Sequence, residues 1–243
     1  MVNKTGQQSQ HARVKHEVGL RIIRGVYPSG DLLPHEQDLI ATLGVSRSVL
    51  REAMRTLAAK GLVEPKKRVG TRVTERDRWN LLDDDVIAWH AKAPERRKDM
   101  LRQVVEARRM IEPSAAMLAA KRRDPGGIQA VSDAMQGMIE AGTDLQAYLN
   151  ADIEFHRSIY RACGNELIGQ MGEILLGALR ISHAVSSRVP KPIERSLPLH
   201  KSVANAIVRG SATTAYRAMT RLIESATEDL RATLGLDTTG AKP

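Results

Sequence analysis

The sequence predicts a mainly α-helical protein in which a small N-terminal domain precedes a larger helical bundle. Aromatic residues make up 3% of the 243 residues and Phe occurs once, so the core must consist of Leu, Ile, Val, Ala and Met. Such a composition is typical of packed helices rather than of sheets. Long segments repeat apolar residues at helical spacing, and Gly, Pro and Asn stand at the joints between them. The hydrophobic content of 42% is sufficient for a buried core.

The basic residues are concentrated in the N-terminal third of the chain. Residues 1–80 hold 15 Lys and Arg against 8 Asp and Glu, whereas residues 81–243 hold 22 against 20, for a net charge of +9. A locally basic small domain on a nearly neutral body indicates a polyanionic partner, because Lys and Arg can replace the counterions of phosphates. Charge alone is explained equally well by a solvated surface.

Cysteine content and hydropathy exclude several other classes of protein. The single Cys163 cannot form an internal disulfide, and no Cys pair with metal-site spacing occurs. The polar N-terminus lacks the apolar region of a signal peptide, and no run approaches the ~18 apolar residues of a membrane-spanning helix. We therefore expect a cytoplasmic protein with no membrane partner.

Three helices are predicted in the N-terminal domain, residues 11–75. The first helix covers residues 11–24 and follows a disordered segment over residues 1–10. The second helix, in HEQDLIATLG, ends at Gly44, and the third, in SRSVLREAMRTLAAKG, has Ser46 as its N-cap.

A hairpin follows the third helix. The segment LVEPKKRVGTRVTE alternates apolar and polar residues around a basic tip that contains Gly, which predicts a two-stranded wing. Two helices joined by a short turn and followed by a wing form a winged helix-turn-helix, a DNA-binding motif. An ordinary pair of amphipathic helices would explain the periodicity. It would not explain a basic hairpin tip together with one arginine stripe, formed by Arg47, Arg51 and Arg55.

The rest of the chain predicts an all-helical domain over residues 94–236, built from about six helices. Residues 76–93 read as a linker with a short helix, and residues 237–243 as a disordered tail. The six predicted helices cover roughly residues 94–123, 125–141, 144–163, 166–188, 197–209 and 211–234.

These motifs resemble a known family. The segment LLPHEQDLIATLGVSRSVLREAMRTLAAKGLVEPKKRVGTRV resembles the N-terminal signature of GntR-family transcription regulators. The helical domain resembles the FCD ligand-sensing domain of the FadR branch, so the resemblance covers about residues 11–236. The segments RDRWNLLDDDVIAWH and EARRMIEPSAAMLAA look most like regulators that respond to sugar acids, notably the D-galactonate-responsive repressors. One departure lies in the wing, where the family has Gly-x-Gly-Thr and this chain has Arg68 in place of the first Gly.

The resemblance implies which residues contact DNA. Arginines at the start of the recognition helix can pair bidentately with guanine, whereas basic residues of the wing meet phosphate or the minor groove. Ser46 also has a role as N-cap, and Arg55 fits a solvated or phosphate-contacting position. The expected DNA-binding residues are Ser46, Arg47, Ser48, Arg51, Lys66, Lys67, Arg68 and Gly70.

A metal site is predicted in the helical domain. Asp152 and His156 are four residues apart on one helix face, and His200 lies on the inward stripe of a later helix. The spacing of the pair alone is more typical of an ion pair. Metal-binding FCD domains have this arrangement with one more His on the last helix, where this chain has Leu222. His183 could substitute, or could be a pocket histidine. The resemblance therefore implies a three-ligand divalent metal site, with Zn²⁺, Ni²⁺ and Mn²⁺ all open.

The same domain is expected to bind a small carboxylate, with a sugar acid as the favoured class. Arg108 matches a family arginine, and a guanidinium facing a cavity suits a carboxylate. Ser182, His183 and Asn205 are further effector-binding candidates. The alternative for Arg108 is an intramolecular ion pair, with one of the carboxylates of Glu106, Glu112 and Asp152.

The sequence therefore predicts a ligand-responsive DNA-binding regulator rather than an enzyme. No metalloprotease-type His-Glu-x-x-His motif and no nucleophile constellation appears. The resemblance implies a homodimer on an inverted repeat and a repressor that its effector releases. Two alternatives stay open: a constitutive or differently induced DNA-binding protein whose helical domain only dimerises, and a metal-dependent enzyme.

Overall fold

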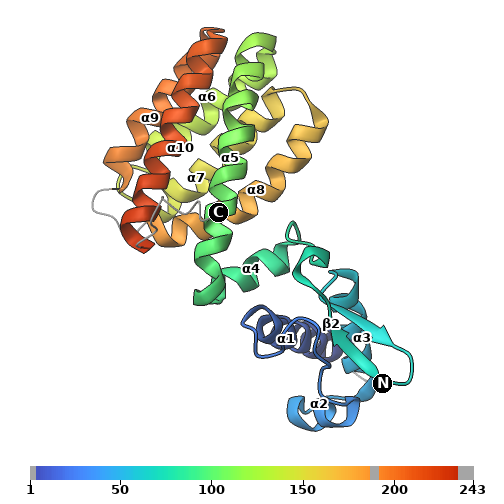
Figure 1. The fold of residues 1–243 in the computed structure, drawn as a ribbon. Helices are drawn as coiled ribbons and strands as arrows, with labels where there is room; N and C mark the ends of the chain where they lie inside the picture. Colours follow the sequence, from blue (N-terminus) through green and yellow to red (C-terminus); the bar gives the residue numbers. More distant parts are fainter. Residues whose placement is uncertain (1–3, 187–191, 235–243) are drawn as a thin grey trace, which may run out of the picture. The chain divides into compact units, whose positions relative to one another are not determined.

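The computed structural model describes the backbone of residues 4–186 and 192–234 and the side chains of residues 9–180 and 192–234. The chain divides into two compact units, Met1–Arg97 and Lys98–Pro243, which we call the head and the bundle (Figure 1). Within the described ranges the fold is mainly helical, with one two-stranded sheet in the head, as the sequence predicts. None of the described helices is long and apolar enough to cross a membrane.

The head contains the predicted winged helix-turn-helix. Its helix-turn-helix is short because α2 ends at Gly44, which has a left-handed φ of 61°, and Ser46 already caps α3. In order, the head consists of α1 (Lys4–Ile23), α2 (Glu36–Leu43), α3 (Arg47–Ala59), β1 (Val63–Lys66), β2 (Gly70–Val73), the 3₁₀ turn η1 (Arg76–Arg78) and α4 (Asp84–Lys92).

An aliphatic core holds the three helices of the head together. The apolar stripe of α1 is buried at the spacing that the sequence predicts, and it packs against residues of α2 and α3. The main contributors are Val14, Val18, Ile22, Leu39, Leu43, Leu50 and Leu57. The first helix differs from expectation at its start, since α1 begins at Lys4 and residues 4–10 are helical instead of disordered. These residues lack Pro and include Lys and Gln, so a helix nucleated by the buried stripe can extend through them.

The wing is a tight antiparallel hairpin. Val63 lies opposite Val73 and Lys66 opposite Gly70, and the two valines face the head core. Arg68, at the tip, has a φ of 62°, a conformation that Gly adopts without strain. The family pattern has Gly at this position. The backbone of Arg68 therefore adopts the left-handed conformation that Gly favours.

The segment 76–93 is packed into the head and is not a free linker. Trp89 of α4 lies directly over Gly19 of α1, where an added Cβ would be 2.5 Å from the indole ring. The indole N–H of Trp89 donates to His16 Nδ1 at 2.8 Å. Lys60, which caps α3, binds Asp83 Oδ1 at 2.7 Å. The predicted short helix exists, but these contacts make it a structural element of the head.

Six helices lie in the described residues of the bundle, in agreement with the sequence. Helix α9 begins at Pro192, before the predicted start near residue 197, because Pro at the first helical position costs no hydrogen bond. The core includes Met138, Phe155 and Met219. The predicted tail lies outside the described residues. The six helices are α5 (Pro94–Arg122), α6 (Pro125–Glu140), α7 (Leu145–Ala162), α8 (Glu166–Ser186), α9 (Pro192–Val208) and α10 (Ala212–Leu234).

Candidate functional site

The three arginines of the recognition helix α3 differ in their partners. Arg47 Nε lies 3.1 Å from Glu36 Oε1, and Arg55 Nη1 lies 3.1 Å from Glu52 Oε2. Among the described residues, Arg51 has no ion pair or hydrogen bond to a side chain. The guanidinium of Arg51 therefore needs no internal bond to be broken before it contacts another molecule.

Ser46 and Ser48 lie at the start of α3, where the sequence places them. Ser46 Oγ accepts the backbone N–H of Val49 at 3.4 Å and lies 3.0 Å from Ser48 Oγ. Ser46 thus has the capping role that the sequence predicts. Contact of these two hydroxyl groups with DNA remains a prediction.

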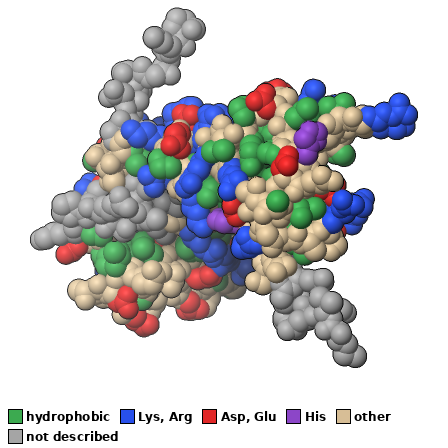
Figure 2. All heavy atoms as spheres, turned by 90° about the horizontal axis from the view of Figure 1, so that it is seen from below, with side chains coloured by type: hydrophobic (Ala, Val, Ile, Leu, Met, Phe, Trp, Pro, Cys, Tyr) green, Lys and Arg blue, Asp and Glu red, His purple; other side chains and the backbone are tan. Residues whose placement is uncertain are grey.

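A groove of about 720 Å³ separates the recognition helix from the wing. Arg51 and Arg55 line one side, and Lys66 and Arg68 line the other. In the space-filling view, Lys and Arg side chains of the molecule reach far into solvent (Figure 2). Cations on both walls make this groove suited to a phosphate backbone.

The basic residues of the wing fall into two groups. Lys66 is tied to Glu64 at 2.7 Å, and Arg78 binds the other oxygen of Glu64 at 2.7 Å. Hydrogen bonds from these two cations lower the pKa of Glu64 to about 2. Lys67 and Arg68 are exposed at the tip, and within the described part of the chain neither has an ion-pair partner. Arg72 of β2 is also exposed and has no ion-pair partner in the described residues, so the free charge of the wing is that of its tip and of Arg72.

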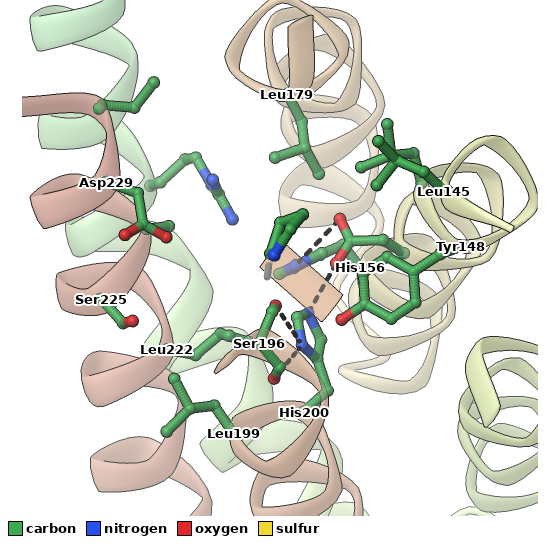
Figure 3. Close-up of a pocket in the computed structure, with 16 residues that line it drawn as sticks. Leu145, Tyr148, His156, Leu179, Ser196, Leu199, His200, Leu222, Ser225 and Asp229 are labelled. Atoms are coloured by element: carbon green, nitrogen blue, oxygen red, sulfur yellow. Dashed lines mark hydrogen bonds and ion pairs between the residues drawn. The ribbon is translucent and has the colours of Figure 1, made fainter. Parts of the chain in front are cut away.

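The bundle brings together the three predicted metal ligands. Asp152 and His156 on α7 and His200 on α9 are all buried, and one donor atom from each lies within 4.8 Å of the others. His200 Nε2 lies 2.7 Å from Asp152 Oδ1, and His156 Nε2 lies 4.0 Å from Asp152 Oδ2. Figure 3 shows His156 and His200 pointing toward one another beneath Leu179.

The ring orientation of both histidines fits a metal. His200 Nδ1–H donates to the carbonyl of Ser196 at 2.9 Å, and His156 Nδ1 lies 3.0 Å from Glu112 Oε2. A proton on Nδ1 leaves the lone pair on Nε2, which faces the cluster in both rings. His200 Nε2 is buried without an aligned hydrogen bond. Two imidazoles and a carboxylate are a donor set for Zn²⁺, Ni²⁺ or Mn²⁺.

Arg108 lines the same cavity but is bound to Glu112. Its Nε lies 2.5 Å and its Nη2 3.3 Å from the two oxygens of Glu112, and both side chains are 3% exposed. Tyr160 donates its hydroxyl to Glu112 Oε1 at 3.2 Å. Burial opposes ionisation of Glu112, but Arg108 and His156 outweigh it and lower its pKa to about 2. Glu112 thus joins the arginine to the histidine cluster.

The cluster opens on a cavity of about 70 Å³. The hydroxyl of Tyr148 is buried at the cavity, close to Ser196. Ser225 and Asp229 of α10 line another side (Figure 3). Asp229 Oδ1 lies 2.8 Å from Arg195 Nη2, and burial raises the pKa of the Asp229 carboxyl. Leu222 is buried in the lining, at or near the position where the sequence resemblance implies a fourth ligand.

The predicted effector residues are placed unequally. Arg108 is in the lining, but its guanidinium already has the internal partner that the sequence left as an alternative. Asn205 is exposed on α9 and absent from the lining, because it lies on the opposite face from Val203 and Ala204. The side chains of Ser182 and His183 lie outside the described residues.

Sequence reasoning missed Tyr148, Ser225 and Asp229. The last two stand four residues apart on α10, a spacing that puts them on one helix face. That spacing is a weak signal, because nothing local indicates which face of α10 meets the cavity.

Comparisons with known proteins agree with both units. The family described as "Bacterial regulatory proteins, gntR family" matches residues 10–73, and "FCD domain" matches residues 103–225. The galactonate operon transcriptional repressor of Escherichia coli K12 is 30% identical over 223 residues, 90% of this chain and 96% of that protein. The regulator LutR of Bacillus subtilis is 30% identical over 203 residues, 82% of this chain and 90% of that protein.

A solved structure has the same fold. The Listeria monocytogenes regulator Lar aligns with 91% of this chain and 96% of its own with a TM-score of 0.65, at 18% sequence identity. The matched families are DNA-binding transcription regulators, not enzymes. The chain therefore belongs to the GntR family of bacterial regulatory proteins, with an FCD domain as its helical bundle.

Proposed function

We propose that this regulator is a repressor whose bundle senses a small hydroxycarboxylate, with a sugar acid such as galactonate as the favoured effector. The observation that carries the proposal is the buried cluster of Asp152, His156 and His200 at a cavity. A sensor needs a site that distinguishes one metabolite, and three potential metal ligands within 4.8 Å of one another at a cavity can supply such a site. The 30% identity to a galactonate operon repressor supports the choice of acid.

The metal is proposed to be part of the sensing site. Asp152, His156 and His200 would hold it, and three protein ligands leave coordination positions for other oxygens. A bound divalent cation supplies electrostatic attraction for a carboxylate and a neighbouring hydroxyl. Glu112 and the Ser196 carbonyl keep the two imidazoles oriented for this role.

The head is proposed to read operator DNA through Arg51 and Arg47, with the wing tip on the phosphate backbone. Arg51 is the cleanest candidate for base contact because it has no internal partner in the described region. The proposed assembly is a homodimer in the cytoplasm, which would place two heads on an inverted repeat. Effector binding would shift the dimer toward a form that fits the operator less well. This shift requires the effector to bind that form more tightly than the form that fits the operator.

The test combines ligand binding with DNA release. An operator is first selected from a random DNA pool, and thermal melting and gel-shift assays follow with D-galactonate, with and without EDTA. We expect galactonate to raise the melting temperature and to release DNA, and EDTA to abolish both effects. His200→Ala should behave like EDTA treatment, whereas Lys201→Ala, exposed on the same helix, should behave like the wild type. Operator affinity indifferent to acids and chelator would instead establish the constitutive DNA-binding alternative.

A further inference from the structure

We infer that Asp229, together with Ser225, forms a hydroxyl-reading end of the bundle cavity that selects hydroxylated monocarboxylates and rejects dicarboxylates and fatty acids. This inference rests on the proposed function and specifies which acids the cavity accepts. It assigns a specificity-determining role to α10, the helix that lacks the expected metal ligand.

The position of the two residues carries the first step. Ser225 and Asp229 are one turn apart on α10 and line the same cavity as His156 and His200 (Figure 3). Asp229 is largely buried, with a side chain 14% exposed, and Arg195 engages its Oδ1 at 2.8 Å. An ionised carboxylate can accept about four hydrogen bonds, so one ion pair leaves capacity for hydroxyl donors. The cavity therefore has an acceptor-rich side.

Tyr148 provides the second step. Its buried hydroxyl lies at the cavity close to Ser196, and Figure 3 shows it on the side of His156 and His200. A tyrosine hydroxyl can both donate and accept a hydrogen bond. A ligand oxygen beside this hydroxyl could accept a hydrogen bond from it. Tyr148 thus offers a donor across the cavity from Ser225 and Asp229.

The charges of the lining indicate how many carboxylates the ligand has. Arg108 and Glu112 neutralise each other, and Asp152 neutralises one of the two charges of a divalent cation. The loaded cluster then carries one excess positive charge, which a single carboxylate balances. A second carboxylate would face Asp229, and an alkyl chain would leave Asp229 with no donor other than Arg195; both arrangements are unfavourable.

The size of the cavity sets the range of chain lengths to test. A volume of about 70 Å³ accepts only a few ligand atoms in the present conformation. A three-carbon hydroxy acid demands less widening than a six-carbon one, although both present the same carboxylate and hydroxyl groups. The ligand panel therefore includes both glycerate and D-galactonate.

The experiment measures dissociation constants of the full-length protein, loaded with Mn²⁺, by calorimetry. The panel consists of glycerate, D-galactonate, the matched dicarboxylate galactarate and the matched unhydroxylated hexanoate. We expect the wild type to bind at least one hydroxylated monocarboxylate at least tenfold more tightly than galactarate and hexanoate. Asp229→Asn should weaken that ligand at least tenfold and reduce its preference over galactarate. Arg195→Gln, which removes the ion pair but keeps the acceptor, should retain most of the preference.

The outcomes separate this inference from the proposed function. An unchanged preference in Asp229→Asn, or an equal loss in Arg195→Gln, overturns the inference while leaving the sensor in place. Equal binding of all four acids by the wild type also overturns the inference and leaves the sensor in place. If no acid binds the wild type, the proposed function itself fails and the inference with it. Circular dichroism and the melting temperature without ligand check that each variant is folded.

Discussion

The head and the bundle use the same kind of ion pair in opposite ways. In the head, Arg47 and Arg55 contact Glu36 and Glu52, but the two arginine side chains are 66% and 79% exposed. In the bundle, Arg108 and Glu112 are each 3% exposed. Exposed pairs contribute about 0–1 kcal/mol, because water competes for both charges. The comparison teaches that head arginines are available to another molecule, whereas Arg108 is committed to holding a buried site.

The largest expected effect tests the buried side of this comparison. Glu112→Ala leaves the Arg108 guanidinium buried without its partner and removes the group that orients His156. We expect the free energy of unfolding to fall by about 3–5 kcal/mol, measured by urea denaturation. Glu52→Ala breaks the exposed pair with Arg55 and should cost about 0–1 kcal/mol. Similar losses in both variants would show that burial does not separate the two pairs.

The next effect concerns the arginine that has no internal partner. Arg51→Ala should remove about 1–3 kcal/mol of discrimination between operator and unrelated DNA, because a bidentate base contact is lost. Its melting temperature should stay within about a degree of the wild type, since the side chain makes no ion pair or hydrogen bond to another side chain in the described residues. Fluorescence anisotropy with both DNAs measures the discrimination. If specificity persists, base reading belongs to Arg47, and Arg51 contacts only phosphate.

A smaller and more uniform effect is expected at the wing tip. Lys67→Ala should weaken binding to every DNA by a similar factor and reduce the slope of log affinity against log salt by about 1. A phosphate contact carries charge but no sequence information. Titrations at several salt concentrations test this, with Lys121→Ala in the bundle as the control. A changed sequence preference in Lys67→Ala would contradict the assignment.

The smallest effect is a pH dependence within the head. Burial lowers the pKa of His90 from 6.5, and His16 is lowered for the same reason. Both are therefore neutral in the folded state at pH values where the unfolded chain already takes up protons. Stability should be constant above about pH 7 and should decline as the pH falls below 6.5. His90→Gln should show a shallower decline in melting temperature between pH 7 and 5, and an unchanged slope would assign the effect elsewhere.

Local sequence patterns predicted the helices of both units and the wing, because each depends on periodicity and on turn residues nearby in the chain. Asp152, His156 and His200 could be predicted from their spacing, from the helix faces on which they lie and from the resemblance to a family pattern. The contact between Glu112 and His156 could not be predicted, because it depends on how α5 and α7 pack against each other. The same applies to Asp229, whose role depends on which face of α10 meets the cavity. Asn205 was misplaced because polarity alone does not distinguish a pocket from solvent.

The packing of Trp89 against Gly19 determines where the gene can be divided and recombined. A head that is fused to the bundle of a different regulator would have to include α4, with the junction after residue 97. A shorter fragment ending at residue 75 would uncover the apolar face of α1 around Gly19 and would tend to aggregate. We therefore expect exchange of heads and bundles among such regulators to succeed with a junction after residue 97 and to fail with a junction after residue 75, about 20 residues earlier.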